Sequence, residues 1–286
     1  MGNPLDYPGP QFLLFYVVFG AVVLILLHLV RGATEGGTAP RIETSDPYLI
    51  AYLRGGKNEA ARVATVSLID RGLLEEKDAK LVATEAATAA RRPIEKAVVT
   101  IFRHPAEATR IFTETSIETA SENYHATLTR VGALPDEEVK RTRYLLLAVA
   151  LLILLGLAAT KIVIALSRGR TNIMFLIILA IVSSVIAVAM THRFRTMRGN
   201  LLLRNVQKYF SRLKDRASTL LPGGATSEVA LLAAVFGVGA LPESRFPYVK
   251  RLYPKAAASG SSCGSSCGSS CGGGGCGGCG GCGGCG

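Results

Sequence analysis

The residues best suited to chemistry in this chain are its seven cysteines, which form one array: Cys263, Cys267, Cys271, Cys276, Cys279, Cys282 and Cys285. The first of them stand four residues apart and the later ones three apart, and residues 1–262 contain no cysteine. Neighbouring thiolates at CxxC spacing can share one soft ion, so the array predicts a site for Zn or Cu(I). A zinc ribbon separates its two CxxC pairs by a folded segment, whereas these pairs are adjacent, which favours a multinuclear thiolate cluster.

The segment that carries the cysteines, residues 255–286, is a Gly/Ser/Cys low-complexity tail. Glycine and serine bury little apolar surface, and glycine loses the most entropy on ordering, so we expect a disordered tail unless something binds it. Gly-rich repeats also expand readily, and a passive repeat is the alternative. Because exposed thiols are reactive and are confined here to one regular array, the sequence favours a functional one.

The rest of the chain offers little chemistry. Its four histidines, His28, His104, His125 and His192, include no pair four residues apart and have no cysteine nearby, so no metal site is predicted among them. No P-loop pattern occurs, and no GxGxxG follows a predicted strand. We therefore predict no catalytic residue and expect the protein not to be an enzyme.

Three apolar blocks predict membrane-spanning helices. Residues 12–30, 144–166 and 173–191 are each about as long as a helix needs to be to cross the hydrocarbon core. The connection 167–172 fits only a short turn, so the second and third spans form a helical hairpin. Lys161 is the only strongly ionised side chain within a span, and its place near the helix end predicts that it snorkels to the interface. The lipid bilayer is thus the first expected partner.

Flanking charge predicts the orientation of the spans. The basic residues that flank the spans divide unequally between the two sides of the membrane. One side would carry Arg168 and Arg170, and the other would carry Arg31, Lys140, Arg141, Arg143, Arg193, Arg195 and Arg198. Because the more basic side faces the cytoplasm, we expect residues 1–11 outside, and residues 31–143 and the C-terminus inside. The basic short turn argues against this orientation. The formal net charge of +11 needs no explanation beyond such anchoring.

Residues 46–143 predict a small helical cytoplasmic domain after a linker at residues 31–45. A first helix begins at Asp46 and Pro47, glycines 55 and 56 turn the chain, a second helix runs to Gly72, and a hairpin follows. This order resembles a winged-helix unit, which in many proteins binds DNA with its second helix. That helix offers only a few basic residues, Lys57, Arg62 and Arg71. A structural or protein-contact role is therefore preferred for the unit, and nucleic acid is not expected as a partner.

Two further helices follow from apolar periodicity. From Pro93, one buried face is predicted to hold Ile94, Ala97, Val98, Ile101 and Phe102. Within residues 192–254, a basic amphipathic helix has an apolar stripe of Leu202, Val206, Tyr209, Phe210, Leu213, Ala217 and Leu220. This helix either lies on an anionic membrane surface or packs against the domain, and the pattern favours neither. The fold class is mainly α, with three transmembrane helices, a small winged-helix-like cytoplasmic domain and a disordered C-terminal tail.

Several stretches of the chain resemble a known family. They are DPYLIAYLRGG followed by AARVATVSLIDRGLL, the three spans, and EVALLAAVFGVGALPESRFPYVKRL ahead of a Gly/Cys tail. The likeness covers residues 1 to about 254 and is to bacterial membrane proteins that carry such a tail and have no settled activity. The resemblance implies the bacterial inner membrane. It also implies, as a partner, a multinuclear iron-dependent oxygenase of the kind that modifies cysteines in ribosomally made peptides.

Two functional hypotheses result. The first is a non-enzymatic integral membrane protein that presents a cysteine-rich tail for soft-metal binding or post-translational cysteine modification. The second is a membrane-tethered regulator whose winged-helix-like domain contacts DNA or a cytoplasmic protein, with an incidental tail. The regular cysteine spacing favours the first. A homo-oligomer is compatible with both.

Overall fold

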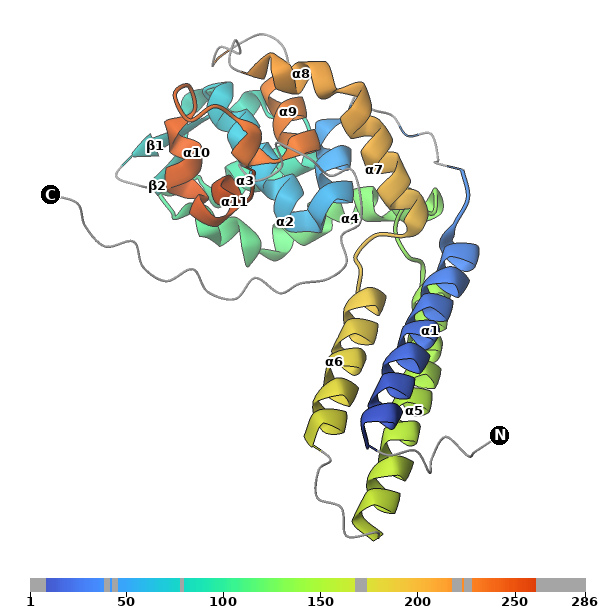
Figure 1. Cartoon of the computed structure of the whole chain (residues 1–286). Coiled ribbons are helices and arrows are strands. Elements are labelled where there is room, and N and C mark those ends of the chain that lie inside the picture. Colours follow the sequence, from blue (N-terminus) through green and yellow to red (C-terminus); the bar gives the residue numbers. More distant parts are fainter. Residues whose placement is uncertain are drawn as a thin grey trace, which may run out of the picture.

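The structure, a computed structural model, describes residues 9–38, 42, 46–77, 80–167, 174–217, 223 and 228–260. In these residues a bundle of long helices joins a rounded, mainly helical domain at one of its ends (Figure 1). The predicted cysteine array lies outside the described residues, and so does the predicted turn between the second and third spans, apart from Ser167.

The bundle consists of α1 (Gly9–Glu35), α5 (Glu137–Ser167) and α6 (Met174–Thr191), and all three are long and apolar enough to cross a membrane. Large apolar side chains face outward, among them Leu14, Leu152 and Phe175, which are 70%, 75% and 67% exposed. Water solvates such a surface poorly, whereas lipid tails solvate it well. The three predicted spans are confirmed as candidate membrane helices, and they indicate a membrane protein.

Two small apolar clusters hold the bundle together. The cluster remote from the domain contains Phe12, Tyr16, Ala158, Leu176 and Ala180, and the one nearer the domain contains Leu27, Leu147 and Ala187. The ammonium group of Lys161 lies 4.5 Å from the centre of the Phe12 ring, which is a cation–π contact. Lys161 therefore holds α5 against α1 near the remote end.

The domain is built from two stretches of chain on either side of α5 and α6. The first stretch holds α2 (Pro47–Asp70), β1 (Leu74–Lys77), β2 (Lys80–Ala83), η2 (Glu85–Ala89), α3 (Pro93–Ile101), η3 (Ala108–Phe112) and α4 (Thr115–Arg130). The second holds α7 (Met197–Tyr209), α8 (Ser211–Asp215), α9 (Glu228–Phe236), η5 (Val238–Ala240), α10 (Pro247–Leu252) and α11 (Pro254–Gly260).

A glycine kink divides α2 into two helical pieces. The carboxylate of Asp46 accepts a hydrogen bond from the Tyr48 amide at 2.9 Å and so caps the first piece. Gly56 has φ 73°, a left-handed conformation that glycine adopts without strain. The hairpin after α2 pairs β1 and β2 antiparallel, with Leu74 opposite Ala83. The predicted helix, turn, helix and hairpin are therefore confirmed as elements.

One hydrophobic core joins the two stretches of the domain. α2 lies at its centre, and α9 packs along α2. Four consecutive residues of α9 are fully buried: Leu232, Ala233, Ala234 and Val235. On α3, Ile94, Val98 and Ile101 are buried as predicted, and so is Phe102 directly after the helix, whereas Ala97 is half-buried.

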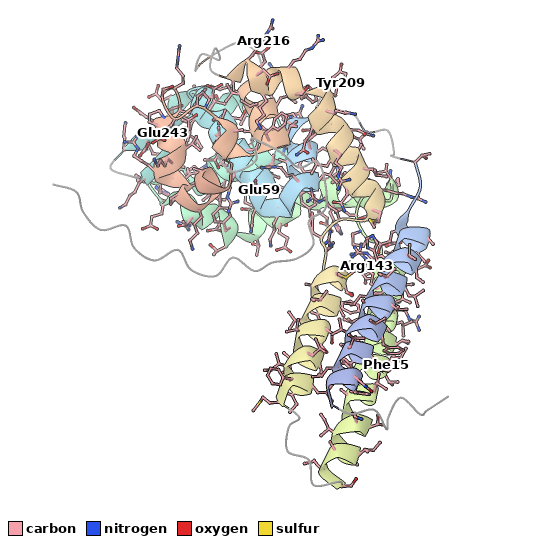
Figure 2. The ribbon with its side chains drawn as sticks, in the orientation of Figure 1. Phe15, Glu59, Arg143, Tyr209, Arg216 and Glu243 are labelled. Carbon is pink, nitrogen blue, oxygen red and sulfur yellow. The ribbon has the colours of Figure 1, made fainter. Side chains whose placement is uncertain are left out.

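The basic amphipathic helix corresponds to α7, and it packs against the domain. Leu202, Leu203 and Val206 belong to the core, whereas Arg204 is exposed. The prediction that Tyr209 continues the apolar stripe is wrong, because Tyr209 is 79% exposed and projects outward (Figure 2). α7 ends at Tyr209, and the chain changes direction there before α8 begins. Of the later residues of the predicted stripe, Phe210, Leu213 and Ala217 are partly buried against the core, and Leu220 lies outside the described residues.

Candidate functional site

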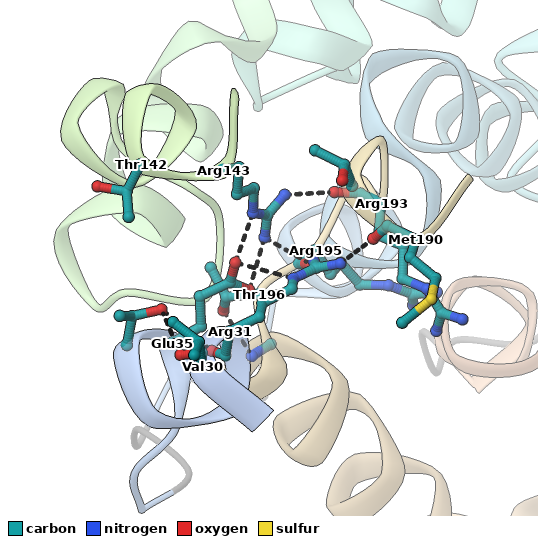
Figure 3. A network of polar contacts seen from close by, with 12 residues as sticks. Val30, Arg31, Glu35, Thr142, Arg143, Met190, Arg193, Arg195 and Thr196 are labelled. Atoms are coloured by element: carbon teal, nitrogen blue, oxygen red, sulfur yellow. Dashed lines mark hydrogen bonds and ion pairs between the residues drawn. The ribbon is translucent and has the colours of Figure 1, made fainter. Parts of the chain in front are cut away.

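The strongest concentration of buried charge lies where the bundle meets the domain, at the place that Arg143 marks in Figure 2. Arg31 and Glu35 occupy the last turns of α1, and Arg143 lies near the start of α5. The connection from α6 to α7, residues 192–196, passes beside them (Figure 3). We call these three side chains and this connection the junction.

A bidentate ion pair forms the centre of the junction. Arg143 donates from Nε to Oε1 of Glu35 at 2.6 Å and from Nη2 to Oε2 at 2.7 Å. Arg31 donates from Nε to Oε1 of the same carboxylate at 2.9 Å. All three side chains are less than a tenth exposed. A carboxylate with two guanidinium partners is a strong acceptor in such a site, and its hydrogen bonds are charge-assisted.

The remaining guanidinium N–H groups cap the end of α6. Arg31 donates to the carbonyl of Met190, and Arg143 donates to the carbonyl of Arg193 at 2.7 Å. Both arginines also reach the carbonyl of Arg195, at 3.4 Å from Arg31 and 3.2 Å from Arg143. The last carbonyls of a helix lack intrahelical partners and form the negative end of its dipole. Only the Met190 carbonyl belongs to α6, and those of Arg193 and Arg195 belong to the connection that follows. The second positive charge, which Glu35 alone does not balance, therefore faces backbone carbonyls at and just beyond the end of α6.

Thr196 ties the same connection to the domain. Its hydroxyl lies 2.7 Å from the carbonyl of Gly132 and 3.0 Å from that of Ala133, so it donates to the end of α4. It also accepts from the Gly199 amide at 3.0 Å and thereby caps α7. Arg198 adds a bond from its Nε to the carbonyl of Gly36 at 2.8 Å. The junction thus fixes the orientation of the domain relative to the bundle.

Arg143 lines two cavities at this end of the bundle. One has a volume of about 220 Å³ and lies beside Thr34 of α1 and Glu138 of α5. The other has a volume of about 310 Å³ and is lined by residues of α4, α5 and the α6–α7 connection, among them His125, Lys140 and His192. The second cavity is the more basic of the two.

A second buried carboxylate lies inside the domain. Glu95 accepts from Tyr48 Oη at 2.7 Å, from Arg71 at 2.8 Å and from the backbone amides of Arg91 and Arg92 at 2.9 and 3.3 Å. Burial alone would raise the pKa of the Glu95 carboxyl, but the hydrogen bonds and the Arg71 charge together hold this pKa below its ordinary value. Glu95 is 3% exposed and joins α2 to the start of α3, so its role is structural.

The basic residues of the predicted recognition helix are each engaged with a carboxylate. Lys57 pairs with Glu118 at 2.9 Å, and Arg71 pairs with Glu95. Arg62 pairs with Glu59, and its guanidinium lies 4.8 Å from the centre of the Phe112 ring. These contacts hold the domain together and leave this helix with little net positive surface.

The four histidines, for which no shared metal site was predicted, lie in different parts of the fold. His28 and His104 are exposed and far apart in the fold, whereas His125 and His192 line the same basic cavity. Across the described ranges, no group of three or more His, Cys, Asp or Glu side chains is arranged to hold a metal ion. The seven predicted cysteine ligands lie beyond Gly260, outside those ranges.

Sequence reasoning missed Glu35, which it placed in a linker. α1 continues past residue 30 to Glu35 and so keeps Arg31 and Glu35 on one helical face. Their spacing of four residues was the available signal, because an Arg and a Glu at i and i+4 on a helix can pair.

No protein-family model, curated protein or solved structure matches the chain.

Proposed function

We propose that this chain is a non-enzymatic membrane protein that presents its cysteine-rich C-terminal tail for soft-metal binding or cysteine modification. The observation that carries the proposal is the regular array from Cys263 to Cys285, which follows closely on α11 of the domain. The buried junction supports it, because it makes the domain a rigid platform on the bundle from which the chain continues toward the array.

The chemistry of the thiols supports either fate of the array. A thiol has an unperturbed pKa near 8.5, so most free cysteines are protonated at neutral pH and must release protons to bind metal. Strong bonds between soft metals and sulfur offset this cost, and Zn and Cu(I) are the ions that the spacing favours. An iron-dependent oxygenase remains the proposed partner for the modification alternative, and this part rests on the family resemblance.

We place the domain and the tail on the cytoplasmic side. Basic residues concentrate at the domain end of the bundle, including the exposed Arg141 and Arg193 and the half-buried Lys140, whereas Arg31 and Arg143 share the charge of Glu35. Basic flanks favour the cytoplasm, and the cytoplasm keeps thiols reduced and available for metal.

The test compares the full chain, purified from its native host, with a variant in which all seven cysteines are replaced by serine. The control variant replaces Ser265, Ser266, Ser269 and Ser270 by alanine, which changes the tail and keeps every sulfur. In the parent and the control we expect bound Zn or Cu, or a mass increment on the tail. In the seven-serine variant we expect neither the bound metal nor the mass increment. If the seven-serine variant keeps the same metal content and no form carries a mass increment, the tail is a passive repeat.

A membrane-tethered regulator with a winged-helix-like domain is the second candidate. The order of α2, its glycine kink, and the β1–β2 hairpin favours it. The ion pairs of Lys57, Arg62 and Arg71 favour a protein contact over DNA within this candidate. Fluorescence anisotropy of labelled duplex DNA against the purified chain tests the DNA form, since true phosphate contacts would weaken steeply with added salt.

A further inference from the structure

The larger cavity beside Arg143 has the composition of an anion site. It lies between α4, the start of α5 and the α6–α7 connection, and has a volume of about 310 Å³. Its nitrogen-bearing lining includes His125, Lys140, His192 and Arg193. Among the described residues that line it, none is acidic. A phosphate-sized anion would therefore meet several hydrogen-bond donors and no acidic side chain of the lining.

Two of these cations are available to a ligand. Lys140 pairs with Glu137 at 2.7 Å, but the two side chains are 39% and 84% exposed, and such surface pairs are weak because water and salt screen them. The Arg193 side chain is exposed, and the junction uses its backbone carbonyl rather than its guanidinium. Arg143, by contrast, also lines the cavity but is committed to its ion pair with Glu35.

The histidines add a polar atom that lacks a partner. Nδ1 of His125 is buried and forms no hydrogen bond within the described structure. A buried polar atom without a partner is costly. The ring of His192 packs edge-on against Tyr144 with centroids 5.7 Å apart, which keeps His192 beside the cavity.

The position of the cavity selects a lipid as the source of the anion. It lies at the ends of α5 and α6, where exposed apolar residues such as Leu145 give way to the polar domain. Tyr144 and Phe194 are also exposed there, and aromatic side chains gather at the level of lipid headgroups. We propose that this cavity binds the headgroup phosphate of an anionic phospholipid, with Lys140 and Arg193 as the principal cations. The proposal is independent of what the cysteine tail does.

The experiment titrates the detergent-solubilised full chain with phosphatidylglycerol or phosphatidylcholine and counts bound lipids by native mass spectrometry. The test variant is Lys140→Gln/Arg193→Gln. The control is Arg141→Gln/Arg204→Gln, which removes the same charge from α5 and α7 at exposed positions outside the cavity. A basic residue near the headgroups contributes on the order of 1 kcal/mol, so we expect the test variant to bind phosphatidylglycerol roughly 30-fold more weakly and the control nearly as tightly as the parent.

Three outcomes would overturn the proposal. Both lipids carry a phosphate, so equal binding of the two by the parent would show that the net negative charge of the headgroup is not selected. An equal loss in the control variant would assign the preference to overall charge. Displacement of phosphatidylglycerol by excess inorganic phosphate, with no requirement for acyl chains, would make the cavity a site for free anions. Circular dichroism of each variant shows that a loss of binding does not come from a loss of fold.

Discussion

Replacing Glu35 by glutamine removes the one carboxylate of the junction and keeps its size. Glu35 accepts at 2.6 and 2.7 Å from Arg143 and at 2.9 Å from Arg31. The glutamine amide presents one oxygen and one NH₂ group, so one guanidinium N–H of Arg143 would face another donor. Two buried arginines would then lack a counter-charge.

The expected loss is a large fraction of the stability of the protein. Removing one partner of a buried ion pair costs about 3–5 kcal/mol, against a total unfolding free energy of about 5–15 kcal/mol for a typical domain. For a chain of this size each kcal/mol lowers the unfolding midpoint by about 2–4 °C, so we expect a drop of roughly 10 °C for Glu35→Gln.

Thermal unfolding in detergent, followed by far-ultraviolet circular dichroism, measures this drop. Glu137→Gln is the matched control, because it makes the same chemical change at the same end of the bundle in an exposed pair with Lys140. That pair contributes at most about 1 kcal/mol, so the control should melt within a few degrees of the parent. A Glu35→Gln variant that melts with the control would refute the inference that the buried charges hold the junction.

Four further predictions concern the domain. Glu95→Gln should destabilise the protein by about 2 kcal/mol at neutral pH. Because the pKa of Glu95 is lowered in the folded state, the contribution of its carboxylate to stability is present above the unfolded pKa of about 4.3 and is lost as the pH falls through the lower folded value. Urea titrations of the parent and the variant should therefore converge in acid. Val66→Asp places a carboxylate at a position with 0% exposure and should abolish the folded domain; soluble, protease-resistant protein would contradict this. Gly56→Ala puts a side chain on a residue with φ 73° and ψ −161°, with its Cβ 3.3 Å from the Phe194 ring, and should cost about 1–3 kcal/mol in the same titration. In a background without the tail cysteines, an impermeant thiol reagent should not label Thr88→Cys in intact cells; labelling would reverse the proposed orientation.

The elements of the domain were predictable where their signals are local. Asp46 and Pro47 mark the start of α2, and adjacent glycines mark its kink, because capping and left-handed φ values depend on the residue itself. The face of α3 followed from the spacing of Ile94, Val98 and Phe102. Each of these features depends on neighbours within a few positions along the chain.

The junction was not predictable for the opposite reason. Glu35 and Arg143 are separated by 108 positions, and a charged residue just after a span is ordinarily assigned to solvent. Their burial depends on α1 extending beyond the bilayer-spanning stretch and on α6 ending beside it. Arg31 and Arg143 were counted as free positive flank charges, whereas the structure gives them a shared acid and helix-end carbonyls. The packing of α9 on α2 is long-range in the same way.

The division of the domain between two stretches of chain has a consequence for its synthesis. The ribosome completes α2, α3 and α4 first, then the hairpin of α5 and α6, and only afterwards α9, whose fully buried Leu232 and Val235 cover α2. Until then the side of α2 that receives α9 has no native cover. The domain therefore reaches its final state only after two membrane helices have been made, so insertion of α5 and α6 into the bilayer and maturation of the domain are a single ordered process.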